Sequence, residues 1–285
     1  DSMFESLPQM KSSLDGIDGL CGLSEDEGEG GLGFSGEKHF CQRPIGMRFQ
    51  FIELCGGAGG VTRELIRRGI ACGPVLDLSL SQQFNLAEHR VIQWLCFMME
   101  DDRLDSFLVS PPCTTFSPAA HPCVRSYKQP RGFDQRLWKV WIGNLLAFAA
   151  LTCLLIALRL EKFGLGEQPR RSKMRWLEEW RRLLMLGARE VFLASCMYGS
   201  PHQKEFCFVG ANMHVELLHR ACSRDHQHVR IQGQYTKPSA VYCDGLVLAI
   251  ATLFEDHLRA RQAAVERLTP AVNGLEDVLT NDRSE

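Results

Sequence analysis

The sequence lacks a strong net charge: its 285 residues carry 32 basic and 34 acidic side chains, a balance of −2. The two kinds of charge are unevenly distributed, because residues 1–38 hold nine acids against two lysines, a net −7, and residues 39–285 therefore carry a net +5. A mildly basic body permits a polyanionic partner without requiring one.

The first residues also lack a hydrophobic secretory segment, and no repeat of fixed period occurs along the chain. The 12 cysteines are scattered through apolar stretches, as at Cys72, Cys96 and Cys153. This distribution is typical of small buried side chains in a reducing compartment rather than of a disulfide framework. We therefore expect an intracellular protein, nuclear if the cell is eukaryotic. The chain begins with Asp1 rather than Met, as a piece of a longer protein would.

Long charge-free hydrophobic runs are scarce, and only residues 141–158 approach the length of a membrane span. Asn144 and Thr152 interrupt this run. A helix buried between a sheet and other helices has the same composition, and we expect the buried helix.

What the sequence does contain is an alternation of strand and helix patterns between residues 46 and 262, flanked by an acidic, glycine-rich tail (1–45) and a polar C-terminal tail (263–285). Strands are predicted at 47–55, 71–78, 106–110, 163–167, 190–196 and 204–210, and helices at 61–69, 86–99, 135–160, 174–187 and 240–262. This alternation predicts an α/β fold with a doubly wound, mostly parallel sheet covered on both faces.

The segment ELCGGAGG (53–60) lies where the first predicted strand passes into a helix. Glycines at 57, 59 and 60 allow a tight turn and a close approach to a ligand, and the helix N-terminus beyond them offers free N–H groups. Asp77, at the end of the next strand, is placed to accept hydrogen bonds from ribose hydroxyls. The pattern suits a nucleoside-bearing cofactor and is not the GxGxxG of a dinucleotide site, although alone it fits a structural turn equally well.

Two prolines brace Cys113 in the segment SPPCTTFSP (110–118), directly after an apolar strand pattern. A cysteine at the carboxyl end of a strand lies on the ligand side of an open α/β sheet, and a loop gives it the exposure that a nucleophile needs. Glu167 in GLGEQP also ends a strand, and it is placed to protonate a ring nitrogen or to cap the following helix. We interpret Cys113 as a catalytic nucleophile rather than as one more packed thiol.

In this order, the segments FIELCGGAGG, SPPCTTFS, GEQP, YGSPHQKEFCFVG and KPSAVY resemble the motifs of DNA cytosine-5 methyltransferases over about residues 49–255. The chain is similar in particular to a short, divergent branch of this family in protist genomes, often beside mobile elements. The resemblance implies a Rossmann-like class I methyltransferase fold with S-adenosylmethionine as cofactor. The implied cofactor contacts are Glu53, Cys55, Gly57, Gly59, Gly60, Asp77, Pro111, Ser239 and Ala240.

The resemblance also implies a mechanism in which the Cys113 thiolate attacks carbon 6 of a flipped-out cytosine and carbon 5 takes the methyl group. Glu167 would contact the ring nitrogen. Lys204 stands at the first arginine of the family's Gln-x-Arg-x-Arg motif, where it keeps the charge but loses the bidentate fork, and Phe206 replaces the second arginine.

Two further departures concern the amide residues and the length of the chain. Gln168 replaces the asparagine of the family's Glu-Asn-Pro motif, and Ser239 replaces the asparagine of its last motif. The long target-recognition region of bacterial members is reduced to residues 211–232. We therefore expect DNA as the substrate, with two alternatives: an RNA cytosine-5 methyltransferase, or an inactive module that binds nucleic acid or a protein partner.

The body contains a basic segment around residues 159–182, in which Arg170 and Arg171 directly follow the Glu167 motif. These two arginines are candidates for phosphate contacts at the rim of the site, as is Arg125 in the loop after Cys113. An ordinary solvated helix face would account for the charges equally well.

The short segment 211–232 contains the sequence CSRDHQH, and its Cys222, His226 and His228 could complete a tetrahedral structural zinc site with Cys196. The spacing is not that of a standard zinc finger. The two histidines alternate along a predicted strand, so that one would face away and Cys207 could take its place. The alternative is a surface loop that contains histidines by chance.

Overall fold

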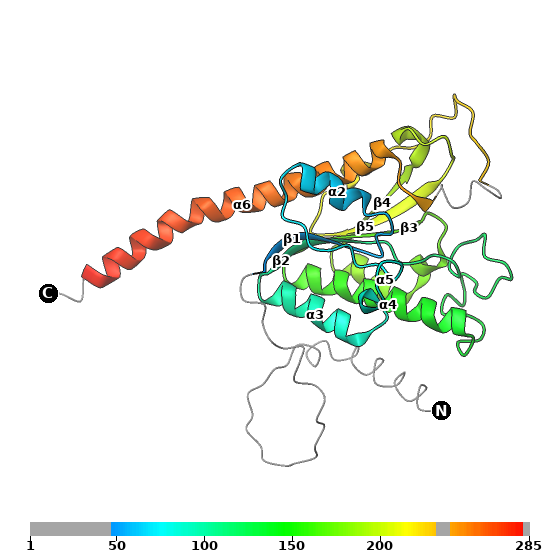
Figure 1. The fold of residues 1–285 in the computed structure, drawn as a ribbon, viewed down its shortest axis with the longest axis horizontal. Coiled ribbons are helices and arrows are strands. Elements are labelled where there is room, and N and C mark those ends of the chain that lie inside the picture. Colours follow the sequence, from blue (N-terminus) through cyan, green and yellow to red (C-terminus); the bar gives the residue numbers. More distant parts are fainter. Residues whose placement is uncertain (1–46, 232–239, 282–285) are drawn as a thin grey trace, which may run out of the picture. The chain divides into compact units, whose positions relative to one another are not determined.

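The computed structural model describes residues 47–231 and 240–281 (Figure 1), with side chains as far as Arg267. The prediction of a flexible tail over residues 1–45 and the assignment of Ser239 to the cofactor site therefore lie outside the described residues.

Five strands form one sheet: β1 (Phe49–Leu54), β2 (Leu104–Val109), β3 (Phe163–Pro169), β4 (Arg189–Ala194) and β5 (Glu205–Ala211). Their order in the sheet is β1-β2-β3-β5-β4. The strands β1, β2 and β3 are parallel to one another, whereas β5 is antiparallel to both of its neighbours. The predicted α/β fold with a mostly parallel sheet is confirmed, with β5 as its one reversed strand.

The strand predicted at residues 71–78 is not a regular strand in the structure. It contacts β1 through two isolated bridges, Cys72 with Phe51 and Leu76 with Leu54. Pro74 lies between them and has no N–H to donate, which explains why a continuous ladder does not form. The segment still follows the edge of β1, and the resulting order, with a reversed strand next to the last, is that of a Rossmann-like class I methyltransferase fold.

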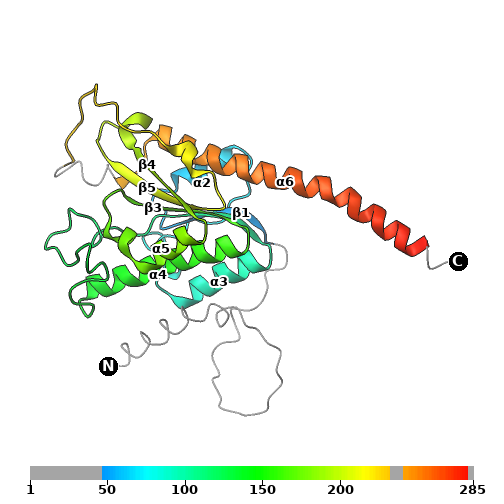
Figure 2. The ribbon, with the colours of Figure 1, turned by 180° about the vertical axis from the view of Figure 1, so that it is seen from behind.

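Helices cover both faces of this sheet. In Figures 1 and 2, α3 (His89–Glu100), α4 (Trp138–Arg159) and α5 (Glu178–Met185) lie on one face, and α2 (Gly60–Arg67) and α6 (Asp244–Asn281) lie on the other. Because side chains alternate along a strand, neighbouring residues of β2 belong to opposite cores: Phe107 packs in the α3/α4/α5 core and Leu108 in the α2/α6 core.

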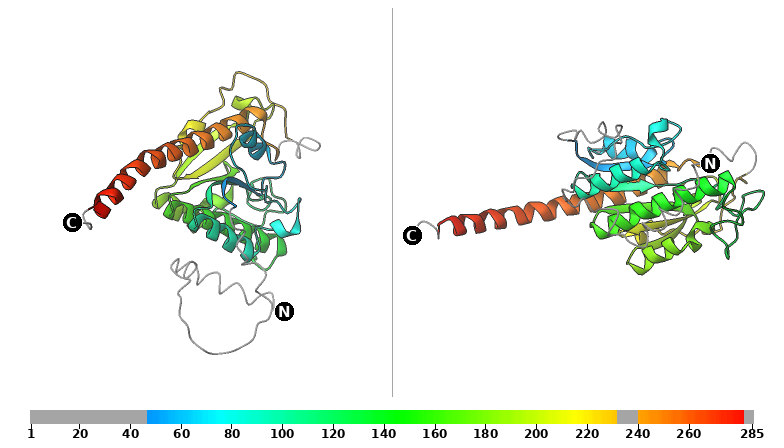
Figure 3. Two further views of the ribbon diagram at one scale, coloured as in Figure 1. Left: turned by 60° about the vertical axis from the view of Figure 1, so that its left-hand side comes forward. Right: turned by 90° about the horizontal axis from the view of Figure 1, so that it is seen from below.

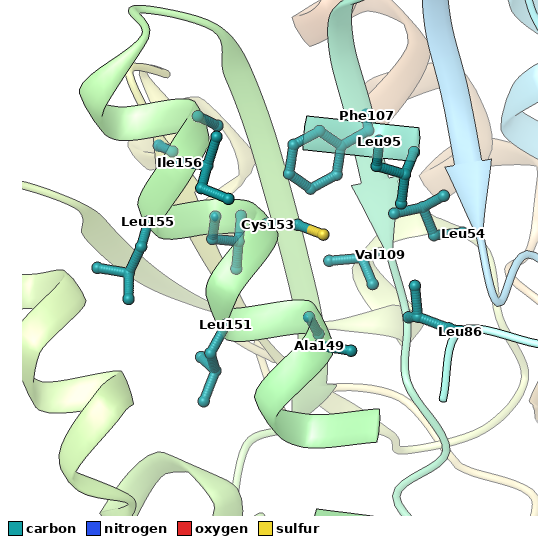
Figure 4. Close-up of a cluster of buried hydrophobic side chains, with 14 of the residues drawn as sticks. Leu54, Leu86, Leu95, Phe107, Val109, Ala149, Leu151, Cys153, Leu155 and Ile156 are labelled. Atoms are coloured by element: carbon teal, nitrogen blue, oxygen red, sulfur yellow. The ribbon is translucent and has the colours of Figure 1, made fainter. Parts of the chain in front are cut away.

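The helix α4 is the one helix in the described residues that is long and apolar enough to cross a membrane, and 67% of its most apolar stretch is buried. It lies beside α3 under the sheet (Figure 3, right). In Figure 4, Cys153 of α4 points toward Val109 of β2, whereas Leu151 and Leu155 point away from that strand. A helix that is apolar all round is buried on several sides, and the expected buried core helix is confirmed.

Two helix predictions were wrong in their bounds. The helix expected at 174–187 is split into a 3-10 turn, η3 (Lys173–Trp176), and α5, because the buried Leu177 between them has an extended backbone. The polar tail expected from residue 263 continues α6 as a helix to Asn281. Strong helix formers follow residue 262, in the sequence AAVERL, and they favour continuation of the helix past that point.

Candidate active site

The carboxyl ends of β1, β2 and β3 meet at one edge of the sheet, which is where open α/β sheets bind ligands. The strand β1 leads into the glycine turn (residues 55–60), β2 into the Cys113 loop (residues 110–118), and β3 ends with Glu167, Gln168 and Pro169. The fold therefore brings the three predicted motifs to the same edge.

The glycine turn has a left-handed backbone at Cys55, Gly57 and Gly59, with φ angles of 54°, 51° and 63°. A side chain at Gly57 would meet no atom within 4 Å, so this position borders open space, whereas a Cβ at Gly59 would lie 2.7 Å from Val75 Cγ2. Burial raises the pKa of the Cys55 thiol to about 12, which keeps it uncharged. The turn therefore offers backbone and an open space to a ligand.

Glu53 supports this turn from inside the protein. Its carboxylate is buried and accepts hydrogen bonds from the Thr62 backbone N–H at 3.0 Å and from the Thr62 hydroxyl at 2.7 Å. Burial raises the pKa of Glu53, and the two bonds from Thr62 oppose this rise. The side chain of Glu53 therefore holds the start of α2 through one carboxylate oxygen, and its direct contact with the cofactor stays a prediction.

Asp77 is tied directly to the glycine turn. Its Oδ2 accepts a hydrogen bond from the Gly57 N–H at 2.9 Å, and its Oδ1 accepts bonds from the Ser79 N–H at 2.8 Å and the Ser79 hydroxyl at 2.6 Å. Burial opposes ionisation, but these bonds hold the pKa of Asp77 below its ordinary value. An ionised carboxylate with remaining lone pairs lies beside the open space at Gly57, which fits a ribose with two hydroxyl donors.

The Cys113 thiol is partly exposed at the start of the turn that follows the two prolines. The Cys113 carbonyl accepts hydrogen bonds from the N–H groups of Phe116 at 3.0 Å and Ser117 at 2.7 Å. Burial raises the pKa of the thiol, the charge of Glu167 raises it further, and the charge of Lys204 lowers it. The structure therefore places the predicted nucleophile, acid and cation close enough for their charges to interact.

Burial raises the pKa of Glu167 to about 7, against the opposing effects of Lys204 and of a hydrogen bond from Tyr242. The Tyr242 hydroxyl also lies 2.8 Å from the Ser110 hydroxyl at the end of β2. Tyr242 was not predicted from the sequence as a site residue. From the same KPSAVY motif, Ala240 was predicted as a cofactor contact, and Ala240 is exposed. The sequence contained one signal for Tyr242, namely that it places an aromatic hydroxyl just before the last helix, α6 (Asp244–Asn281).

Side chains from β3 and η3 hold the Cys113 loop in place. The buried Gln168 amide donates to the Pro111 carbonyl at 2.8 Å, and its oxygen accepts from the Ser172 hydroxyl at 2.9 Å. Lys173 donates through its backbone N–H to the Phe116 carbonyl at 2.9 Å and through Nζ to the Ser117 carbonyl at 3.2 Å. Pro111 is the buried residue near the start of this loop, and its carbonyl accepts the hydrogen bond from Gln168.

The prediction that Arg125 contacts phosphates is wrong, because its side chain is fully buried. Its guanidinium group stacks on Phe116 at 3.9 Å from the ring centre and donates to four acceptors at 2.6–3.0 Å: the oxygens Thr115 Oγ1, Asn144 Oδ1 and the carbonyls of Pro130 and Val140. Burial lowers the pKa of Arg125 to about 10, so it stays charged at neutral pH. It joins the Cys113 loop to α4.

Replacing Arg125 with methionine is expected to lower the free energy of unfolding by about 2–4 kcal/mol, because several buried acceptors lose their donor. Urea unfolding followed by circular dichroism measures this change. The matched control is Arg171→Met at an exposed position, where a change within about 0.5 kcal/mol is expected. Equal stability of the two variants would contradict the structural role of Arg125.

Arg170 and Arg171 remain at the surface beside the end of β3. Arg170 pairs with Glu205 at 2.7 Å and is half exposed, and Arg171 is exposed. Together with Pro169, Gln203 and Glu205 they line a shallow hollow. The assignment of these two arginines to phosphate binding therefore stays a prediction that their positions permit.

The four candidate metal ligands come from two separate segments. Cys196 lies in η4 (Ser195–Tyr198), and Cys222, His226 and His228 lie in the loop that follows residue 220. The expected strand through the histidines is wrong, since this segment is irregular and both rings approach Cys222. Cys207 is not a substitute ligand, because it is buried in β5 with its thiol 3.4 Å from Glu190.

Comparison with known proteins gives similarity at the level of solved structures alone, since no family model and no curated protein matches the chain. The chain is similar to the S. pombe Dnmt2 methyltransferase (16% identity, 67% of this chain and 62% of that chain, TM-score 0.37). It is also similar to the Entamoeba histolytica methyltransferase EhMeth (11%, 65% and 58%, 0.36) and to a mutant of Spodoptera frugiperda DNMT2 (16%, 66% and 56%, 0.33). The chain spans about three fifths of the length of these proteins. The assignment of the fold rests on the strand order of this chain.

Proposed function

We propose that this protein transfers a methyl group from S-adenosylmethionine to carbon 5 of cytosine in DNA, through a transient covalent bond to Cys113. One observation carries the proposal: the charges of Glu167, near the carboxyl end of β3, and Lys204, just before the antiparallel strand β5, both act on the Cys113 thiol in the loop after β2. A nucleophile, a proton donor and a cation beside a nucleoside site are the groups that this chemistry requires.

The residues of the glycine turn fit the cofactor. The open space at Gly57 admits a ligand close to the backbone, and the ionised Asp77 beside it can accept both ribose hydroxyls. The bound cofactor would supply an electrophilic methyl group. The turn would hold that group near Cys113, because β1 and β2 are neighbours in the sheet.

At the base, the Cys113 thiolate forms a bond to carbon 6 while the double bond between carbons 5 and 6 opens, which makes carbon 5 nucleophilic. Carbon 5 would then form the bond to the methyl group, while the bond from that methyl carbon to the sulfonium sulfur of the cofactor breaks and leaves a neutral thioether. Loss of the proton from carbon 5 restores the double bond and expels the thiolate. Glu167 assists the first step when it donates its proton to the ring nitrogen, because this withdraws electrons from carbon 6.

The pKa of about 7 suits Glu167 to this role, since its carboxyl group can then carry a proton near neutral pH, where an ordinary glutamate is ionised. The charged form of Glu167 raises the pKa of Cys113, and Lys204 lowers it. Protonation of Glu167 therefore removes a charge that opposes the thiolate. The competent state combines a neutral Glu167 with an ionised Cys113.

Trapping with 5-fluorocytosine tests the proposal. With fluorine at carbon 5 there is no proton to lose, so elimination stops and the protein stays covalently bound to the oligonucleotide. We expect an adduct that needs S-adenosylmethionine, resists denaturing electrophoresis and is absent from Cys113→Ser. Matched DNA and RNA oligonucleotides in parallel reactions distinguish the two substrates: an adduct with RNA alone would favour the RNA alternative.

The absence of an adduct with either nucleic acid would contradict methyl transfer. Binding of the same oligonucleotides, measured by fluorescence anisotropy, then separates the remaining outcomes. Binding without an adduct would support the inactive nucleic-acid-binding module, and failure of both measurements would leave no support for a nucleic-acid substrate.

A further inference from the structure

We propose that Cys196, Cys222, His226 and His228 bind one structural zinc ion. The four possible ligand atoms, two sulfurs and two imidazole nitrogens, all lie within 4.8 Å of one another. They come from two segments that are far apart in the sequence, so their convergence is a product of the fold. Two cysteines and two histidines without an acidic ligand are a donor set typical of closed, structural zinc sites.

The distances between ligand atoms fit a tetrahedral ion. Zinc–sulfur bonds of about 2.3 Å and zinc–nitrogen bonds of about 2.0 Å place a sulfur and a nitrogen roughly 3.5 Å apart at the tetrahedral angle. Cys222 Sγ lies 3.6 Å from His228 Nε2 and 3.9 Å from His226 Nε2. Both histidines therefore present Nε2 toward the same point as the thiol.

A second, independent observation concerns the other nitrogen of His226. Its Nδ1 lies 2.9 Å from Oδ1 of Asp225, which also accepts a hydrogen bond from the Ser223 hydroxyl. A carboxylate that accepts a hydrogen bond from Nδ1–H favours the tautomer with an unprotonated Nε2 and fixes the plane of the ring. This is the usual support for a histidine that binds zinc.

The proposed zinc site would crosslink the short segment that stands where bacterial relatives carry a target-recognition region. Two backbone hydrogen bonds hold the ends of this segment: the Ala194 N–H donates to the Arg220 carbonyl at 2.8 Å, and the Val229 N–H donates to the Pro201 carbonyl at 2.8 Å. The residues between these ends have an irregular backbone. A zinc ion bound there would join the middle of the segment to η4.

The same zinc ion would also help to hold Lys204 in its place beside the candidate active site. Ser195, the residue before Cys196, donates its N–H to the Lys204 carbonyl at 2.8 Å, and its hydroxyl accepts from the Lys204 N–H at 3.3 Å. His202, two residues before Lys204, also forms a bridge with Val229 at the end of the segment. Zinc at this point would therefore fix the backbone that carries the cation of the candidate active site.

Metal analysis of the purified full chain by inductively coupled plasma mass spectrometry tests the proposal. We expect one zinc per chain in the wild type and less than a tenth of that in Cys222→Ser. The matched control is Cys123→Ser, an exposed cysteine outside the cluster, which should keep its zinc. Asp225→Asn should keep the fold but bind zinc about 10–100-fold more weakly in a chelator competition.

Cobalt replacement supplies a readout that an adventitious ion would not give. After exchange of the metal in the wild-type protein, we expect the intense visible bands of tetrahedral cobalt together with a thiolate-to-cobalt charge-transfer band. A wild type without stoichiometric metal, or equal metal in Cys222→Ser and Cys123→Ser, would overturn the proposal. If Cys222→Ser does not fold, the cobalt spectrum and the chelator competition on the wild-type protein test the zinc proposal instead. None of these measurements depends on methyl transfer.

Discussion

Methyl transfer is expected to fall by at least about 10⁴-fold when Cys113 is replaced by serine, because a serine hydroxyl is a far weaker nucleophile than a thiolate. The thiol lies on a loop whose hydrogen bonds run through backbone groups and neighbouring side chains, so the shape of the loop should survive the substitution. Single-turnover transfer of a radiolabelled methyl group to DNA measures the loss. Affinity for the cofactor and for DNA should change little.

Cys123→Ser is the matched control for this experiment. Cys123 lies in the same stretch of chain after β2 and is exposed, and we assign it no part in the reaction. Its rate should stay within about a factor of two of the wild type, as expected for a surface substitution of less than about 0.5 kcal/mol. An equal loss in both variants would indicate damage to the loop rather than removal of the nucleophile.

The second large effect is expected for Glu167→Gln, which should lower kcat/KM by about 10²–10⁴-fold, the usual contribution of a positioned proton donor. Glutamine keeps the size of the side chain and can still accept the hydrogen bond from Tyr242. It cannot carry the proton that the ring nitrogen needs. Steady-state kinetics across a series of pH values measures both the loss and its origin.

The expected pH dependence of the rate follows from Glu167 and Cys113, because the reaction requires a protonated Glu167 and an ionised Cys113. Below about pH 7 the wild-type Glu167 is protonated, and the rate should rise with pH as the Cys113 thiolate forms. Above about pH 7 each further gain in thiolate is matched by an equal loss of protonated Glu167, so the rate should level off until Cys113 itself is ionised.

In Glu167→Gln no proton is lost near pH 7, and the rate should continue to rise with pH through that region. Loss of the negative charge also removes one of the two causes that raise the pKa of Cys113, burial being the other. The rise should therefore end at a lower pH than the ionisation of the wild-type thiol. A break near pH 7 that persists in the variant would assign that titration to another group.

The parts of the site that could be predicted from the sequence are those that local chain chemistry determines. The glycine turn, the proline-flanked Cys113 and the strand-terminal Glu167 each lie within one short motif, and the parallel sheet brings such motifs to one edge. The irregular backbone at 71–78 also had a local signal in Pro74, which the prediction of a strand there did not take into account.

The errors involve contacts between distant residues. A loop arginine has the same local pattern whether it is exposed or buried, and the burial of Arg125 depends on Asn144 of α4. The position of the Tyr242 hydroxyl in the site depends on its contact with Ser110, which lies 132 residues earlier in the chain. The orientation of the two histidines depends on the irregular backbone of their loop, which includes a left-handed residue at Arg224 with a φ angle of 64°.

The hydrogen bonds that hold the Cys113 loop have a consequence for how the protein would select its substrate. Gln168, Lys173 and Arg125 hold this loop through hydrogen bonds to or from β3, η3 and α4, all of them within the protein. The thiol is therefore preorganised, and an incoming base does not have to order the loop by induced fit. A loop that already has its final shape contributes little discrimination between one nucleic-acid sequence and another. Selectivity would then depend on how readily a cytosine leaves its stack, which favours mismatched, single-stranded or looped targets.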